Sequence, residues 1–366
     1  MAARLVHAAT HTGFGSSPRT SRRRVSLGAA QQRKYARFVG AHKKKMASMT
    51  ISSAVDDDVP ELPDYDIVKL GSLETSALAL SLRGWTGGSD DANTYVAAVD
   101  RGYTLLGAHH PSELALAREY QKYWSLSDAA QLPGVRAPKV YAIIEVGQTN
   151  GASVAESMQA HAIAAGGAEP DVACLRLAPG ADVSAVAAGV ATAIELGACP
   201  GTIAVDGFSE DDLHTIVRQL EKDAPEARVA FNRIPFSIKN RAAETGGVLE
   251  TCKALGVGVI ASDPLGPTFC ITDPKHADHD VGQIQLLTFL GAMVGGGVQR
   301  SPMQVGLNWV VTKGATPEVE TRMPTRAWEC GGAMLWRLDE NAVGIVDERA
   351  AATDGDEGGR GGGFQA

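Results

Sequence analysis

The chain has 366 residues, of which 44% are hydrophobic, and its formal net charge is -8. This length suffices for one large domain or two ordinary ones, and the hydrophobic content is typical of a globular protein. No apolar run reaches the roughly 20 residues that a membrane-spanning helix needs, so we expect no membrane span. The five cysteines are odd in number and form no CxxC pair, which argues against a disulfide framework or a zinc site.

The charged residues are distributed unevenly along the chain. Residues 1–50 contain eleven Lys or Arg and no Asp or Glu, whereas the rest of the chain carries 23 basic and 42 acidic residues. An Arg- and Ser-rich segment without acids is typical of an organelle transit peptide, and we interpret residues 1–55 as one for the chloroplast, with the mitochondrion as the alternative. A basic arm could also bind nucleic acid, but the acidic remainder argues against such a partner. The Gly-rich residues 350–366 are expected to form a flexible tail.

Between these tails, over residues 64–349, short apolar or β-branched runs alternate with segments of helical pattern. The expected strands are 78–85, 103–108, 139–147, 171–179, 201–208, 227–236, 257–266 and 315–321. The expected helices are 89–102, 112–124, 153–167, 182–198, 209–224, 246–256, 283–294, 301–314, 325–336 and 339–350. Ser89 is expected to cap the first helix, and the S-x-x-D pattern of Ser209 and Asp212 predicts a capping box.

Eight strands that alternate with helices predict an α/β fold of the (β/α)₈ barrel type, because strands buried on both faces appear as continuous apolar runs. An open doubly wound sheet is the alternative, and it should carry a G-x-G-x-x-G turn after its first strand, which is absent here. In a barrel the chemistry lies where the strands end. The residues at these ends are Ser81 to Trp85, Gly107 to Pro111, Glu145, Arg176, Asp206, Arg233, Ser262, Asp263 and Glu318 to Arg322.

Five segments, in order, resemble the aldo-keto reductases, which are NADPH-dependent (β/α)₈ enzymes. They are VKLGSLETSALAL, IAVDGFSEDDL, NRIPFS, GVLETCKALGVGVIASDPLG and SPMQVGLNWVVTKGATPEVETR, and together they span roughly residues 66–348. The first resembles the N-terminal hairpin that plugs the family's barrel, and the fourth is similar to a C-x-x-x-G-I-x-V-x-A-Y-S-P-L-G pattern. The resemblance therefore implies a plugged barrel and reduction of carbonyl groups with NADPH.

The resemblance also implies a catalytic tetrad, which this chain does not carry. A Tyr protonates the forming alkoxide, a Lys held by an Asp lowers the pKa of that Tyr, and a His orients the carbonyl group. The Asp position falls on Gly107, the Lys position on Glu145 and the His position on Arg176, and the loop after Gly107 is too short for the Tyr. His109 and His110 follow in that loop, and His110 is a weak candidate for a rebuilt proton donor.

The cofactor contacts that the resemblance implies are replaced in part. At the nicotinamide end the Ser-Asn pair falls on Asp206 and Gly207, the Gln on Arg233, the stacking Tyr on Ser262 and the next Ser on Asp263. At the adenosine end Arg322 matches the base that pairs with the 2′-phosphate, and Glu329 matches an adenosine contact. The cofactor positions that the resemblance gives are thus Arg322, Glu329, Ser262, Asp263 and Leu265. NADP is weakened as a cofactor, because the two aspartates oppose a polyanion.

The replaced positions alternate in sign along the strand order, as Glu145, Arg176, Asp206, Arg233 and Asp263. Adjacent strands lie about 4.8 Å apart, so each charge is within reach of an opposite neighbour. We therefore hypothesise a charge ring in the barrel mouth, because buried charges are tolerated when they are paired.

Three functions follow as alternatives. The favoured one is a reductase-like pseudoenzyme that binds a small molecule at the C-terminal barrel mouth or an unidentified protein partner. The second is an NADP-dependent oxidoreductase with a rebuilt proton donor. The third is a lyase or isomerase without nicotinamide, in which Glu145 and Arg176 handle an acidic substrate.

Overall fold

The computed structural model describes residues 65–127, 130, 134–147, 153–266, 280–294 and 298–357, with side chains described as far as residue 351. These residues belong to one compact unit, Asp57–Ala366. The expected transit peptide at residues 1–55 lies outside the described residues, so its role in targeting stays a prediction. Among the described residues, no helix is long and apolar enough to cross a membrane.

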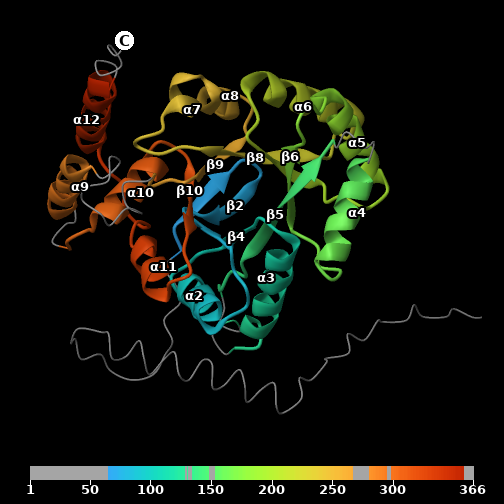
Figure 1. The fold of residues 1–366 in the computed structure, drawn as a ribbon, viewed down its shortest axis with the longest axis horizontal. Helices are drawn as coiled ribbons and strands as arrows, with labels where there is room; N and C mark the ends of the chain where they lie inside the picture. The colour runs from blue at the N-terminus through green and yellow to red at the C-terminus, as the bar shows by residue number, and fades with distance from the viewer. Residues whose placement is uncertain are drawn as a thin grey trace, which may run out of the picture. The chain divides into compact units, whose positions relative to one another are not determined.

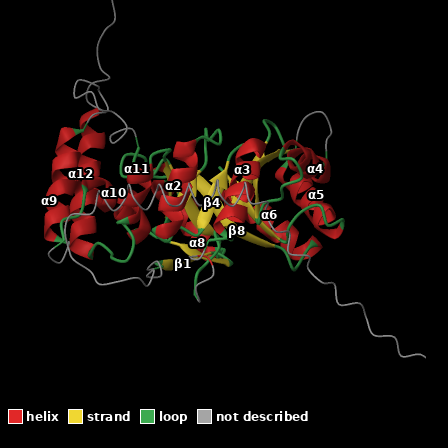
Figure 2. Cartoon of the chain, turned by 90° about the horizontal axis from the view of Figure 1, so that it is seen from below, coloured by secondary structure: helices red, strands yellow, loops and turns green. Residues whose placement is uncertain are grey.

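Eight parallel strands close into a barrel, as predicted, and helices surround it (Figures 1 and 2). Around the barrel the strand order is β10, β3, β4, β5, β6, β7, β8 and β9. Their bounds are β3 Ala79–Ser81, β4 Leu105–Ala108, β5 Lys139–Val146, β6 Val172–Leu177, β7 Thr202–Asp206, β8 Arg228–Pro235, β9 Gly258–Ser262 and β10 Thr316–Glu320. Consecutive strands are hydrogen-bonded neighbours, so the carboxyl ends of all eight meet at one rim.

The helices follow the strands closely in the chain. Their bounds are α2 Ser89–Asp100, α3 Pro111–Trp124, α4 Val154–Ala164, α5 Val183–Glu195, α6 Glu210–Asp223, α7 Ala242–Thr245, α8 Val248–Ala254, α9 Val281–Met293, α10 Pro302–Thr312, α11 Pro324–Gly331 and α12 Glu340–Glu357. The capping box of Ser209 and Asp212 is confirmed at α6. Helix α12 continues to Glu357, beyond the point at residue 350 where the sequence predicts a flexible tail.

The prediction that Ser89 caps α2 is wrong, because the N-cap is Gly88 and Ser89 is the first helical residue. The reason lies in Asp91, whose buried carboxylate accepts hydrogen bonds from the backbone N–H groups of Thr86, Gly87 and Gly88. Asp91 is the third helical residue, and its carboxylate thus fixes the preceding loop and the N-cap residue, as the acid of a capping box does, so that the helix begins at Ser89.

A two-stranded antiparallel hairpin, β1 Ile67–Leu70 and β2 Leu73–Ser76, precedes the barrel, as the family resemblance implies. Leu70 and Leu73 belong to the same buried cluster as the barrel-lining side chains Tyr141 and Phe231, so the hairpin closes the end of the barrel opposite the strand carboxyl ends. Its turn contains Gly71, where φ is +57° and an added Cβ would collide with the backbone carbonyl of Ala230. Only glycine fits this position.

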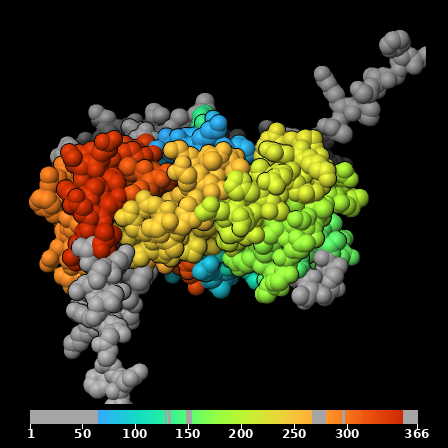
Figure 3. Space-filling view, turned by 90° about the horizontal axis from the view of Figure 1, so that it is seen from above, coloured from blue at the N-terminus to red at the C-terminus, as the bar shows by residue number. Residues whose placement is uncertain are grey.

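A second core separates the barrel from its outer helices, and α12 is attached there by partly buried polar contacts. Asp347 of α12 accepts hydrogen bonds from Trp309 at 3.0 Å and from Lys313 at 2.7 Å, and it forms an ion pair with Arg241 at 3.2 Å. In Figure 3 the red surface of the C-terminal residues accordingly lies against the gold surface of the segment that contains α7.

Helix α4 buries a histidine that lacks any polar partner among the described residues. Both ring nitrogens of His161 are inaccessible to water and make no hydrogen bond. Burial lowers the pKa of His161 from its ordinary value, and the neighbouring His110 lowers it further. Because the unfolded chain takes up a proton below about pH 6.5 and the folded chain resists it, folding stability should fall as the pH drops below that value.

We expect His161→Leu to stabilise the protein by about 1 kcal/mol at neutral pH, since it removes unsatisfied polar atoms from an apolar site. The gain should grow at pH values below about 6.5, where wild type loses stability. Urea unfolding of both proteins at neutral and mildly acidic pH measures the difference. The exposed His214 on α6 supplies the control, because His214→Leu should leave this pH dependence unchanged. A destabilised His161→Leu protein would contradict the interpretation.

Candidate functional site

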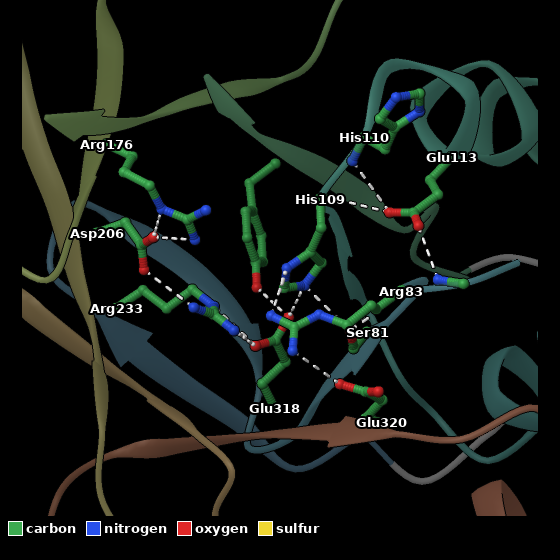
Figure 4. Close-up of polar contacts among 12 residues, drawn as sticks. Ser81, Arg83, His109, His110, Glu113, Arg176, Asp206, Arg233, Glu318 and Glu320 are labelled. Atoms are coloured by element: carbon green, nitrogen blue, oxygen red, sulfur yellow. Dashed lines mark hydrogen bonds and ion pairs between the residues drawn. The ribbon is translucent and has the colours of Figure 1, made fainter. Parts of the chain in front are cut away.

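Glu318, the middle residue of β10, lies at the centre of the barrel mouth (Figure 4). Its side chain is only 2% exposed, and both carboxylate oxygens are occupied. Oε1 accepts hydrogen bonds from the Tyr141 hydroxyl at 2.6 Å and from Nε2 of His109 at 2.8 Å, while Oε2 accepts one from Nε of Arg233 at 2.8 Å. Burial by itself would raise the pKa of Glu318, but the His109 hydrogen bond and the Arg233 charge outweigh it and lower the pKa to about 2.

From Glu318 a chain of ion pairs runs across three further strands. Arg233 on β8 binds Asp206 on β7 at 2.9 Å, and Nε of Arg176 on β6 donates to the same carboxylate at 2.6 Å. Arg233 and Asp206 are less than 9% exposed, whereas Arg176 is 45% exposed. We call Arg176, Asp206, Arg233 and Glu318 the mouth ion-pair chain. Each of its buried members has an opposite charge beside it, which makes its burial tolerable.

The hypothesis of a charge ring is confirmed for three of its five members and wrong for the other two. Glu145 stands opposite Arg176 in strand register, yet it is exposed and makes no ion pair with any described residue. Asp263 is exposed as well and lies one residue beyond β9. An ion pair with a solvated carboxylate contributes little stability, so Arg176 pairs instead with Asp206, whose side chain is almost buried. Glu318 completes the chain in their place.

The Tyr141–Glu318 contact occupies the space next to Gly107. Gly107 pairs with Tyr141 in strand register, and a Cβ at Gly107 would come within 2.7 Å of Oε1 of Glu318 and closer still to the Tyr141 hydroxyl. There is therefore no room for the aspartate that the family resemblance puts at this position. Tyr141 does not replace the missing tyrosine either: it is fully buried, and burial followed by the Glu318 charge holds its pKa well above the ordinary value.

His109 is held in one tautomer by its partners. Nη2 of Arg83 lies 3.2 Å from Nδ1, and since a guanidinium can only donate, Nδ1 is the acceptor and Nε2 carries the proton. That proton points to Glu318, and the Ser81 hydroxyl lies 3.0 Å from the same Nε2. In a Ser-His-acid triad the serine and the acid bind opposite ring nitrogens. This arrangement therefore cannot activate Ser81 as a nucleophile.

His110, the weak candidate for a proton donor, lies outside this network. It is exposed and caps α3, where its Nδ1 accepts a hydrogen bond from the backbone N–H of Ser112. Its own backbone N–H and that of His109 bind the carboxylate of Glu113, which fixes the loop (Figure 4). The His110 side chain caps the N-terminus of α3, and it takes no part in the mouth ion-pair chain.

A cavity of about 470 Å³ opens beside the mouth ion-pair chain, between the ends of β9 and β10 and helix α11. Its wall includes Arg83, Ser262, Asp263, Leu265, Glu320 and Arg326. Cys330 also lines it, but burial raises the pKa of this thiol to about 12, so it is not a thiolate at neutral pH. Within the described part of the chain, no group of three or more His, Cys, Asp or Glu side chains could hold a metal ion.

Three of the cofactor positions given by the resemblance, Ser262, Asp263 and Leu265, line this cavity, and Arg322 does not. Nε of Arg322 donates to Asp91 at 2.8 Å, so its guanidinium is bound to the start of α2. Glu329 is partly buried on α11, outside the cavity wall.

The described residues do not fit the nicotinamide end of NADP. Asp206 is bound by two arginines, and Asp263 presents a carboxylate to the cavity where an anionic cofactor would lie. The Asp263 carboxylate carries the same sign of charge as the phosphate groups of NADP, so it would favour a cation rather than a phosphate beside it.

The sequence analysis includes Arg83 among the strand-end residues, but it does not point to Tyr141 or Arg326 at this site. Side chains alternate along a strand, so the sequence could have predicted that Tyr141 lies on the same strand face as Glu145 and points inward. The hydrogen-bond partner of Tyr141 could not be predicted, because 177 residues separate Tyr141 from Glu318. Arg326 lies three residues before Glu329, on the same side of α11, which is a signal for a cation near the adenosine end.

No family model and no curated protein matches the sequence. Solved structures do match. An aldo-keto reductase from Klebsiella pneumoniae in complex with NADP and acetate superimposes with a TM-score of 0.60 at 13% identity, over 78% of this chain and 96% of that one. The Bombyx mori aldo-keto reductase in complex with NADP gives 0.58 at 15% identity, over 78% and 92%. A thermostable aldo-keto reductase with the inhibitor epalrestat gives 0.59 at 16%, over 77% and 98%.

The fold is that of the aldo-keto reductases. Each of these structures is covered almost entirely, so the likeness extends over the whole barrel and its hairpin. At 13 to 16% identity it concerns the fold, whereas function depends on the side chains at the mouth.

Proposed function

We propose that this aldo-keto-reductase-like barrel does not reduce carbonyl groups and instead binds a small ligand in the cavity at its mouth. One observation carries the proposal: the position at which a proton donor would act is filled by Glu318 and its three hydrogen-bond donors. Tyr141 and His109 both direct their protons at this carboxylate, and neither offers one to the cavity. Catalysis of carbonyl reduction needs a donor within hydrogen-bond reach of the carbonyl oxygen.

The test is turnover of NADPH by the full chain. A set of aldehydes and ketones is incubated with protein and NADPH, and oxidation is followed by nicotinamide absorbance, with an authentic aldo-keto reductase as the positive control. We expect no turnover above that of a heat-denatured sample. Turnover at about 1 s⁻¹ or faster, the low end of ordinary enzymes, would overturn the proposal.

NADP binding without reduction is the second candidate, favoured by the NADP complexes among the similar structures and by Arg326 in the cavity wall. Titration of NADP by calorimetry separates the two, because only this second candidate predicts tight binding of the dinucleotide. Arg326→Gln should then weaken that binding by about tenfold, the loss expected for one charged hydrogen bond.

The lyase or isomerase alternative loses its support. It needs Glu145 and Arg176 to act on one substrate, but the guanidinium of Arg176 is bound to Asp206, and Glu145 makes no contact with it among the described residues.

A further inference from the structure

The charges around the cavity divide into paired and unpaired ones. Arg233 is bound by Glu318 and Asp206, and Arg83 contacts His109 and forms an ion pair with Glu320 at 3.6 Å. Arg233 is neutralised by buried partners that a ligand would have to displace. The Arg83 and Glu320 side chains pair with each other and are more than half exposed, so water already solvates their charges and a ligand gains little from them.

Asp263 is one of the two charged side chains in this wall without such a partner. Its carboxylate makes no hydrogen bond and no ion pair with any described residue. The charge of Arg83 acts on it only electrostatically, from beyond ion-pair distance. Asp263 is exposed overall, but partial desolvation at the cavity wall raises its pKa from the ordinary value, and Arg83 partly opposes the rise. A cationic group in the cavity would stabilise the ionised carboxylate.

The backbone at Asp263 adopts an uncommon conformation within a hydrogen-bonded turn. Its φ is +52°, in the left-handed region that non-glycine residues adopt seldom and mostly at functional or turn positions. The carbonyl of Asp263 accepts a hydrogen bond from the N–H of Gly266 at 3.0 Å, which closes a turn that contains Pro264. A carboxylate on a closed turn is preorganised for a ligand, because little conformational freedom remains to be lost on binding.

Arg326 is the second unpaired charge among the described wall residues. It lies in the first turn of α11 and is partly buried, and within the described part of the chain its guanidinium donates a hydrogen bond to the sulfur of Met303 alone, at 2.9 Å. A thioether is a weak acceptor, so the donors of Arg326 remain available for a carboxylate, which a guanidinium can bind with two parallel hydrogen bonds. Arg326 and Asp263 do not form an ion pair with each other, so the cavity presents one free charge of each sign.

We infer that the cavity binds a small zwitterion, an amino acid or short peptide whose ammonium group meets Asp263 and whose carboxylate meets Arg326. The inference rests on the proposed function, because it concerns the same cavity. Leu265, Leu307 and Val319 line the same cavity and provide an apolar wall, which suits an aliphatic side chain on the ligand.

Calorimetric titration of the full chain with four matched probes tests the inference. Leucine and alanyl-leucine carry both charges at two separations, leucinamide carries only the positive one and isocaproate only the negative one. We expect one of the zwitterions to bind at least about tenfold more tightly than either singly charged probe, since a hydrogen bond to a charged group supplies that factor.

Two variants assign the ends of the ligand. In Asp263→Asn the zwitterion should bind no better than isocaproate, and in Arg326→Gln no better than leucinamide. Asp211→Asn and Arg218→Gln, two exposed side chains on α6 that do not line the cavity, are the matched controls and should leave binding unchanged. Unchanged melting temperatures would confirm that the variants are folded.

The outcomes separate the two proposals. If isocaproate and leucine bound equally well, and Asp263→Asn changed neither affinity, the inference of a zwitterionic ligand would be overturned. The proposed function of binding a small ligand would still stand. Failure of all four probes to bind at millimolar concentration would also overturn it, while the NADPH assay decides independently whether the barrel is a reductase.

Discussion

Replacing Glu318 with Gln should lower the free energy of unfolding by about 3–5 kcal/mol, the usual cost of removing one partner from a buried ion pair. The substitution keeps the shape of the side chain and removes its charge. Arg233, which is only 8% exposed, would then lose its main counter-charge and keep only Asp206, which it shares with Arg176. Urea denaturation measured by circular dichroism gives the difference between the two proteins.

Glu320 is the matched control for this experiment. It lies two residues further along β10, also pairs with an arginine, and is 57% exposed. Glu320→Gln should change stability by no more than about 0.5 kcal/mol, because exposed ion pairs contribute little. If both variants lost the same small amount, the mouth ion-pair chain would not be the buried network that we describe.

Acid should remove the same stabilisation from wild type. The pKa of Glu318 is lowered from 4.5 to about 2, so its contribution is fully present above pH 4.5 and is lost as the pH falls toward 2. This difference in pKa corresponds to about 3 kcal/mol. Other carboxylates also titrate in this range, so the quantity to measure is the stability of wild type minus that of Glu318→Gln.

We expect this difference to be constant between pH 5 and 7, as ordinary carboxyl groups are ionised there, and to shrink steadily below about pH 4.5. Unfolding at a series of pH values, each in urea, provides it. A difference that stayed constant down to about pH 3 would show that the Glu318 carboxylate is not what stabilises the mouth.

Much of the scaffold could be predicted from local patterns. Strands such as 139–147, rich in Val, Ile and Tyr, and helix starts such as Ser209 with Asp212 are signals contained within a few neighbouring residues. The errors were local as well. At α2 the carboxylate of Asp91 fixed the preceding loop so that Gly88 became the N-cap, and at the C-terminus α12 continued into the expected tail.

The sequence by itself predicted the eight-fold alternation of strands and helices and the N-terminal hairpin, and the structure confirms both. The replacement of the reductase tetrad stays a prediction that rests on the family resemblance. Only the tertiary structure decided how the replacing charges pair. Glu318 and Tyr141 are 177 residues apart, and the choice of Arg176 between Glu145 and Asp206 depends on how far each carboxylate is withdrawn from water. Burial sets the strength of an ion pair, and burial is a property of the closed barrel that no short stretch of sequence carries.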